Sequence, residues 1–312
     1  MIVLYLVPVI FFGWSLGAND GANVFGPTVT NGLIKYKNAV LISAGFVLLG
    51  AMLEGRNGLH TLSSVSSQTL ITATIGVICA AASMTIMTFI GIPASSSQAM
   101  MGSIIGIGLL KSSVDWSVLI KVIICWVATP IGAIIFGFVL YKVIGFFFNK
   151  ITSMVKQNIV LKIMGIAIGA YGSYALGANN VANVTGPFAE FLNFEVAALV
   201  GGLSIGFGII TYSKKVMYTV GKSIVQLDLF SSVISVLALS VTLWIFAIIG
   251  VPVSSSQAIV GAVIGAGLAR GSLRSLNTKT LRKISLGWVS TPLISGIFSA
   301  LIFFVLSMFF TL

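Results

Sequence analysis

Apolar residues run along most of this chain in long stretches rather than alternating with polar positions. A stretch of about 20 apolar residues is long enough to cross a bilayer as an α-helix. Several stretches are shorter, or are broken by glycine, proline and polar runs. We therefore predict an all-α polytopic membrane protein with broken helices, over residues 1–17 with 21–34, 39–53, 66–92 with 98–110, 117–148, 160–176 with 181–192, 196–212, 227–249 with 257–269 and 284–311.

The polar interruptions recur, in the same order, in the second half of the chain. Four motifs return at offsets between 159 and 162: GANDGAN (17–23) as GANNVAN (177–183), GIPASSSQA (91–99) as GVPVSSSQA (250–258), GSIIGIGL (102–109) as GAVIGAGL (261–268), and WVATP (126–130) as WVSTP (288–292). We predict two repeats, residues 1–150 and 151–312, that form a single membrane domain without a soluble domain.

The composition narrows the class of protein. Hydrophobic residues make up 57% of the chain and charged residues 7%, against about 25% charged in soluble domains. Too few charges remain to cover a surface that faces water, which excludes a soluble globular protein, a disordered chain and a collagen-like fibre. The net charge of +11 comes from basic residues in short loops between apolar stretches. That pattern marks orientation in a lipid bilayer, so we expect no nucleic-acid partner.

Charge placement indicates that the two repeats cross the membrane in opposite directions. Lys35 follows the first GAN motif, whereas Glu190 stands at the matching place after the second. The positive-inside rule puts fourteen of the seventeen basic residues in the cytoplasm, in loops 35–38, 142–162, 213–222 and 270–283. Both termini then lie outside the cell, with the N-terminal stretch retained as the first span of a multi-pass plasma-membrane protein. Inverted repeats are the architecture of secondary transporters.

Pro93 and Pro252 each precede the sequence Ser-Ser-Ser-Gln. Proline ends a helix and suits the start of the next, and serine is a good N-cap. A helix N-terminus offers free N–H groups and the positive end of the helix dipole, so it binds an oxyanion without a cationic side chain. One such run would also fit close helix packing. Two runs in matching repeats favour two re-entrant hairpins that meet near the midplane and bind an anion.

The first GAN motif contains Asp20, the one carboxylate that falls clearly inside a predicted span. An acid at membrane depth is costly and indicates a functional site by default. Further amide oxygens come from Asn19, Asn23, Asn179, Asn180 and Asn183. Carboxylate and carbonyl oxygens suit a hard cation such as sodium, or Asp20 itself carries a proton; the alternative is a helix break without a ligand. Because Gly17, Gly21 and Gly177 permit unwound backbone, we expect the helices to break at both GAN motifs.

Enzyme chemistry is not expected. A serine nucleophile needs a base, and no His or Lys lies within the predicted spans close to either Ser-Ser-Ser-Gln run. GSIIGIG and GAVIGAG lack the βαβ context of a nucleotide site and instead predict close helix packing. Cys79 and Cys125 have no CxxC partner, which excludes a zinc site. We expect no catalytic residue and no cofactor other than a coupling ion.

The duplicated GAND-type and P-x-S-x-x-type motifs, with GIITYSKKVMYTVGKSI at 208–224, resemble the inorganic phosphate transporter (PiT) family over essentially the whole chain. The resemblance implies a secondary transporter that imports phosphate with sodium or protons, often as a homodimer. It implies an anion site at Ser95, Ser96, Ser97, Gln98, Ser254, Ser255, Ser256 and Gln257. It implies a cation site at Asp20, Asn23, Asn180 and Asn183, with Asp20 and Asn23 as ligands of a sodium ion.

Two departures from the family pattern leave the substrate and the coupling open. The second motif has Asn180 where the family usually has Asp, so one midplane carboxylate is missing. Many relatives have Ser-Thr-Thr-His where this chain has Ser-Ser-Ser-Gln. Protonated phosphate has a hydroxyl that needs an acceptor, whereas sulfate at neutral pH only accepts, so a sulfate permease of the same fold is the alternative. An anion channel is the third hypothesis, and accumulation driven by a sodium or proton gradient would distinguish it.

Overall fold

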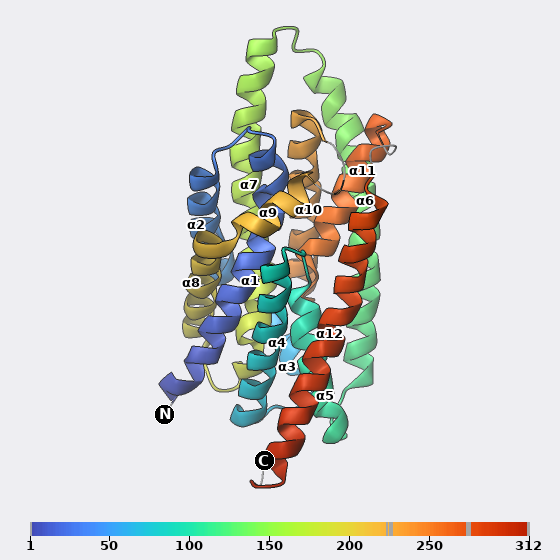
Figure 1. Ribbon diagram of the computed structural model, residues 1–312. Helices are drawn as coiled ribbons and strands as arrows, with labels where there is room; N and C mark the ends of the chain where they lie inside the picture. The colour runs from blue at the N-terminus through green and yellow to red at the C-terminus, as the bar shows by residue number, and fades with distance from the viewer. Residues whose placement is uncertain (1, 223, 225–226, 273–275, 311–312) are drawn as a thin grey trace.

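The computed structural model describes residues 2–222, 224, 227–272 and 276–310. These residues form twelve α-helices and one short 3-10 helix that lie largely along one common axis (Figure 1). In chain order they are α1 (Ile2–Thr30), α2 (Tyr36–Glu54), α3 (Arg56–Ser63), α4 (Leu70–Ile90), α5 (Ser96–Leu110), α6 (Trp116–Phe148), α7 (Met154–Thr185), η1 (Gly186–Phe188), α8 (Phe194–Tyr212), α9 (Lys214–Lys222), α10 (Leu229–Ile249), α11 (Ser255–Arg270) and α12 (Thr278–Ser307). The prediction of an all-α protein is confirmed.

Seven of the described helices are long and apolar enough to cross a membrane: α2, α4, α6, α7 together with η1, α8, α10 and α12. The outer helices α6 and α12 leave large apolar side chains on the surface, including Ile124 and Val289, each 62% exposed. A broad apolar surface of this kind marks contact with a membrane or a partner rather than with water. The prediction of a multi-pass membrane protein is confirmed.

The helices do not break at the GAN motifs, and that prediction is wrong. α1 and α7 run through both motifs without interruption. The glycines serve close packing instead, because a Cβ on Gly17 would lie 1.9 Å from the carbonyl oxygen of Ile205 in α8. A Cβ on Gly177 would likewise lie 2.0 Å from the carbonyl oxygen of Val47 in α2. Small residues let helix backbones approach this closely.

The two glycine motifs that follow the Ser-Ser-Ser-Gln runs also pack helices closely, as predicted. A Cβ on Gly102 of α5 would lie 2.3 Å from the carbonyl oxygen of Pro292 in α12. A Cβ on Gly261 of α11 would lie 2.4 Å from the carbonyl oxygen of Pro130 in α6. The matched motifs therefore make matched contacts, each with a helix of the other half of the chain.

Two helical hairpins, α4–α5 and α10–α11, turn back within the bundle (Figure 1). α4 ends at Gly91, with φ of 82°, and α10 ends at Gly250, with φ of 77°. Glycine adopts this left-handed conformation without strain and closes many helices. The glycines, rather than the prolines two residues further on, therefore end the first helix of each hairpin. The two predicted hairpins are present.

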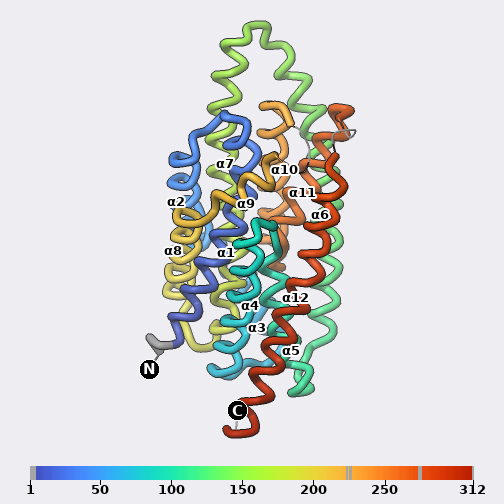
Figure 2. Tube along the Cα trace, in the orientation of Figure 1, coloured from blue at the N-terminus to red at the C-terminus, as the bar shows by residue number. Residues whose placement is uncertain are grey.

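The helices of the two halves follow each other in the same order, α1 to α6 and then α7 to α12. α1 packs on α8 and α7 on α2, while α5 packs on α12 and α11 on α6. Matching helices, such as α1 and α7 or α6 and α12, run in opposite directions along the bundle (Figure 1). α1 begins and α12 ends at one end, and the α6–α7 connection projects from the other (Figure 2).

Two short helices have no counterpart among the predicted segments. α3 buries Leu59 and Leu62 on one side, and α9 buries Val216, Met217 and Val220. The opposite sides carry polar residues, so each helix is amphipathic, and with eight and nine residues they are too short to cross a membrane.

Candidate functional site

Two buried contacts join α1 to the tips of both hairpins, by which we mean the Ser-Ser-Ser-Gln runs at 95–98 and 254–257. Ser96, the first residue of α5, donates a hydrogen bond from Oγ to Asp20 Oδ2. Asn23 Nδ2 donates to the Oγ of Ser255, the first residue of α11, at 2.9 Å. Asp20 and Asn23 are three residues apart on one helix, so they lie within about one helical turn. The two hairpin tips therefore converge at the same level of α1.

Each tip carries a serine N-cap, as predicted. Ser95 Oγ accepts from the backbone N–H of Gln98 at 3.3 Å, and Ser254 Oγ accepts from that of Gln257 at 3.2 Å. The other N–H groups of a first turn have no partner within the helix, and the helix dipole adds partial positive charge there. Two such helix ends directed at one place suit an oxyanion.

All twelve predicted site residues are buried, with exposed fractions between 0 and 7%. They are Asp20, Asn23, Ser95, Ser96, Ser97, Gln98, Asn180, Asn183, Ser254, Ser255, Ser256 and Gln257. Of the eight tip residues, Ser96 and Ser255 contact the α1 pair, while Asn180 and Asn183 lie on α7, which contacts both α1 and α5. Protein encloses the site on all sides.

Six buried polar atoms of these residues have no hydrogen-bond partner among the described residues: Asp20 Oδ1, Asn23 Oδ1, Gln98 Oε1, Asn180 Nδ2, Asn183 Oδ1 and Gln257 Oε1. The great majority of buried polar groups in proteins are paired. Six unpaired buried atoms on α1, on α7 and at the two hairpin tips therefore mark these residues as candidates for binding a polar ligand.

Asn19 and Asn179 fix the backbone just before each tip, a role that the sequence did not indicate. Asn19 Oδ1 accepts from the N–H of Ala94 at 2.9 Å, and Asn179 Oδ1 accepts from the N–H of Val253 at 3.0 Å. Their amide oxygens therefore hold the hairpin rather than standing free for a cation. The only sequence signal was their matched position in the two GAN motifs.

The short helices α3 and α9 each hold the hairpin turn of the other half. Thr219 of α9 donates from Oγ1 to the carbonyl oxygen of Gly91 at 2.8 Å. Thr61 of α3 donates from Oγ1 to the carbonyl oxygen of Gly250 at 2.5 Å. Lys215 of α9 adds a hydrogen bond from Nζ to the carbonyl oxygen of Phe89. The two threonines are 158 positions apart, close to the repeat offset, which is the signal that could have identified them.

The two matched tryptophans of the WVATP and WVSTP motifs differ in their contacts. Trp288 Nε1 donates to Ser256 Oγ at 3.0 Å, so α12 reaches the tip of α11. Trp126 Nε1 is buried and has no partner among the described residues. Among the described residues, one half of the chain therefore has a polar contact at this place and the other half does not.

The candidate cation ligands are oxygens only. The described part of the chain has no group of three or more His, Cys, Asp or Glu side chains that could hold a metal ion. No Lys or Arg forms an ion pair with Asp20 in that part of the chain. The free Oδ1 atoms of Asp20 and Asn23 fit a hard cation such as sodium, which prefers carboxylate and carbonyl oxygen, better than a transition metal.

Known proteins match the chain over nearly its whole length. A candidate phosphate permease of Pyrococcus horikoshii is 28% identical, covering 98% of this chain and 97% of that protein. The sulfate permease CysP of Bacillus subtilis is 27% identical, covering 92% and 82%. A solved structure, of the sodium-dependent phosphate transporter, superposes with a TM-score of 0.86 over 99% of both chains at 23% identity, which shows the same fold. The sequence model of the phosphate transporter family matches residues 16–299, and the chain belongs to that family.

Proposed function

We propose that the protein is a secondary transporter that imports inorganic phosphate across the plasma membrane with a cation, by alternating access. The observation that carries the proposal is the convergence of both Ser-Ser-Ser-Gln tips on one turn of α1, through Asp20–Ser96 and Asn23–Ser255. The helix N-termini and hydroxyls capture the anion. A cation on α1 offsets the charge of the anion in a site that protein encloses. The anion ligands are Ser95, Ser96, Ser97, Gln98, Ser254, Ser255, Ser256 and Gln257.

The coupling ion is sodium or a proton, with Asp20 as the group that takes it up. Sodium is the first candidate because the free Oδ1 atoms of Asp20 and Asn23 lie within a turn of each other. Two such oxygens fit a cation that needs several ligands. A proton would use Asp20 alone and leave the Asn23 oxygen without a role. Asn180 and Asn183 stand at the matching places on α7.

Residues 1–150 and 151–312 form two inverted repeats that rock against each other around the site. The opposite directions of matching helices support this division (Figure 1), as do the exchanged contacts α1–α8 and α7–α2. Rocking of one repeat against the other around a fixed site is the usual form of alternating access. The homodimer that the family resemblance implies stays a prediction.

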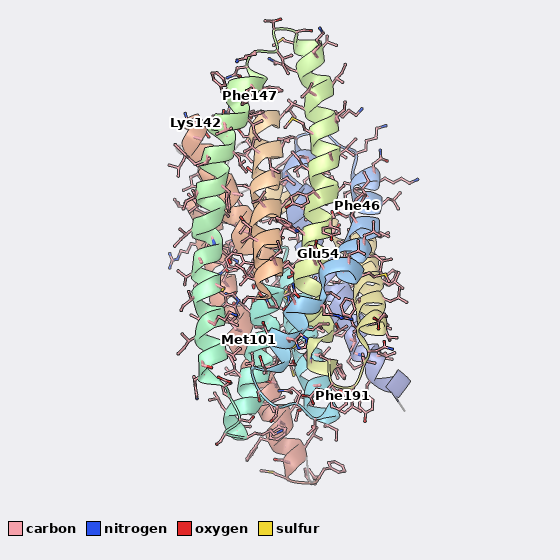
Figure 3. All side chains as sticks on the ribbon, turned by 180° about the vertical axis from the view of Figure 1, so that it is seen from behind. Phe46, Glu54, Met101, Lys142, Phe147 and Phe191 are labelled. Atoms are coloured by element: carbon pink, nitrogen blue, oxygen red, sulfur yellow. The ribbon has the colours of Figure 1, made fainter. Side chains whose placement is uncertain are left out.

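The end of the bundle at the α6–α7 connection faces the cytoplasm, and both termini face outward. Lys142 lies toward that end in Figure 3, on the same side of the molecule as Phe147. Lys150 also lies there, with Nζ 4.3 Å from the centre of the Phe146 ring. Basic residues concentrate on the cytoplasmic side of membrane proteins, which supports this orientation.

Sulfate is the second candidate substrate. The Bacillus subtilis relative is a sulfate permease. The tips of this chain carry Gln98 and Gln257, and neither side chain is charged. Sulfate has no hydroxyl and only accepts hydrogen bonds, so the serine hydroxyls and backbone N–H groups at the tips suit it as well as they suit phosphate.

Uptake of radiolabelled phosphate and sulfate into liposomes that contain the purified protein tests the proposal. Each anion is offered with an inward sodium gradient, an inward proton gradient, or neither. Phosphate accumulation above equilibrium under the sodium or the proton gradient is expected. Equilibration of the anion without accumulation would indicate a channel, and accumulation of sulfate alone would indicate the second candidate.

A further inference from the structure

The two halves of the site differ at one matched position, Asp20 in α1 and Asn180 in α7. Both side chains are fully buried. Asp20 Oδ2 accepts from Ser96 and its Oδ1 is free. Asn180 Oδ1 accepts from Asn183 Nδ2 at 3.1 Å, and its Nδ2 is free. The matching atoms left for a ligand are therefore a carboxylate oxygen on α1 and an amide N–H on α7.

The next matched pair, Asn23 and Asn183, also differs between the two halves, in the partner to which each side-chain amide donates. Asn23 gives its Nδ2 to Ser255, whereas Asn183 gives its Nδ2 to Asn180. Each keeps a free Oδ1. α1 therefore offers two free acceptors, one of which is charged, and α7 offers one donor and one neutral acceptor.

A cation and an anion have opposite preferences for the free atoms of α1 and those of α7. A hard cation binds oxygen acceptors, and a carboxylate adds the negative charge that the cation needs in an enclosed site. An amide N–H carries partial positive charge and would oppose a cation placed beside it. The same N–H donates a charge-assisted hydrogen bond to an oxyanion. The α1 set therefore fits a cation, whereas the α7 set fits an oxygen atom of the anion.

We propose that the site binds one coupling cation, at Asp20 and Asn23 of α1, and that Asn180 of α7 donates from Nδ2 to the transported oxyanion. This inference rests on the proposed transport function and names the part that α7 plays in it. Asn180 is thus an anion-binding residue: it holds an unprotonated oxygen of the anion, which phosphate and sulfate both provide. Of the two matched places, only the one with a carboxylate carries the cation.

The flux ratio of sodium to anion tests the number of cations. Purified protein in liposomes takes up radiolabelled sodium and radiolabelled phosphate, or sulfate, in the same experiment. We expect one sodium per anion for the wild type, and two for Asn180→Asp, because that change supplies the second carboxylate. If the wild type carries two sodium ions per anion, the one-cation assignment is wrong, although gradient-driven transport stands. If neither anion accumulates under any cation gradient, the transport function itself is wrong.

Equilibrium binding tests the role of Asn180 without needing transport. Radiolabelled phosphate and sulfate are titrated against purified, monodisperse protein at saturating sodium. Asn180→Ala removes the donor, and we expect Kd for the anion to rise about 10- to 100-fold, as for the loss of a hydrogen bond to a charged group. Its sodium dependence should persist, since Asp20 and Asn23 remain. The matched control, Asn158→Ala, changes an exposed residue of the same helix and should leave Kd unchanged. Wild-type anion affinity in folded Asn180→Ala would overturn the assignment.

Discussion

Asn23 donates a hydrogen bond from Nδ2 to Ser255 Oγ at 2.9 Å, across 232 positions of the chain. The contact joins a helix of the first half to the hairpin tip of the second. One turn earlier on the same helix, Asp20 accepts from Ser96 at the tip of the first hairpin. α1 is therefore the element through which both tips are positioned relative to each other.

Removing the Asn23 side chain should weaken both the cation site and the link between the halves. In Asn23→Ala the free Oδ1 is lost as a ligand, and Ser255 loses its donor. We expect the sodium concentration for half-maximal uptake to rise about tenfold, in line with a change of about 1.4 kcal/mol. Asn38→Ala, at an exposed position of α2, is the control. A sodium response equal to that of the wild type would remove Asn23 from the cation site.

Asp20→Asn should abolish the dependence of uptake on the coupling ion, because the change keeps the shape of the side chain and removes the negative charge. The matched control is Asp115→Asn, at the exposed N-cap of α6, where asparagine caps as well as aspartate. Initial uptake rates measured against sodium concentration and against external pH check the prediction. If Asp20→Asn keeps the sodium or pH dependence of the wild type, the coupling ion binds elsewhere.

The threonines of the short helices should matter for stability and for transport rate. Thr219→Val removes the donor to Gly91, and Thr61→Val removes the donor to Gly250. Each loses one hydrogen bond and leaves a carbonyl without its partner, which costs about 1–3 kcal/mol. The thermal unfolding temperature of the purified protein and the initial rate of uptake should both fall. Thr74→Val is the control, because among the described residues Thr74 Oγ1 donates only to the carbonyl oxygen of Leu70 in its own helix, and it should behave like the wild type.

Much of the fold follows from the sequence, because long apolar runs and repeated motifs are local patterns. The hairpins, the serine caps and the small-residue contacts of α5 and α11 were predicted correctly. The unbroken course of α1 was not, because the role of Gly17 depends on Ile205, which lies 188 positions away and packs against it. The site shows the same contrast between local patterns and distant contacts. Asp20 and the serine tips stand out in the sequence. Thr61 and Thr219 do not, and Trp288 stands out only as part of a repeated motif, because their partners Gly250, Gly91 and Ser256 come from other helices.

The packing role of Gly17 can be tested directly. In Gly17→Ala the new Cβ would overlap the carbonyl oxygen of Ile205 at 1.9 Å, so α1 must move away from α8. Overpacking of this kind costs about 1–3 kcal/mol, and we expect a lower unfolding temperature in detergent. Gly45→Ala is the control, since a Cβ there meets no atom within 4 Å. Equal unfolding temperatures of the two variants would show that the α1–α8 contact tolerates a side chain.

The most direct test of the anion site is gradient-driven phosphate uptake by the double variant Ser96→Ala with Ser255→Ala, in liposomes. Both serines begin their helices at the point where the two tips meet α1. The control is Ser64→Ala with Ser307→Ala, two exposed serines outside the site. We expect the control to accumulate phosphate like the wild type, while the site variant, folded and reconstituted to the same density, shows no accumulation above protein-free liposomes. Wild-type accumulation by the site variant would contradict the assignment of the two hairpin tips as the anion site.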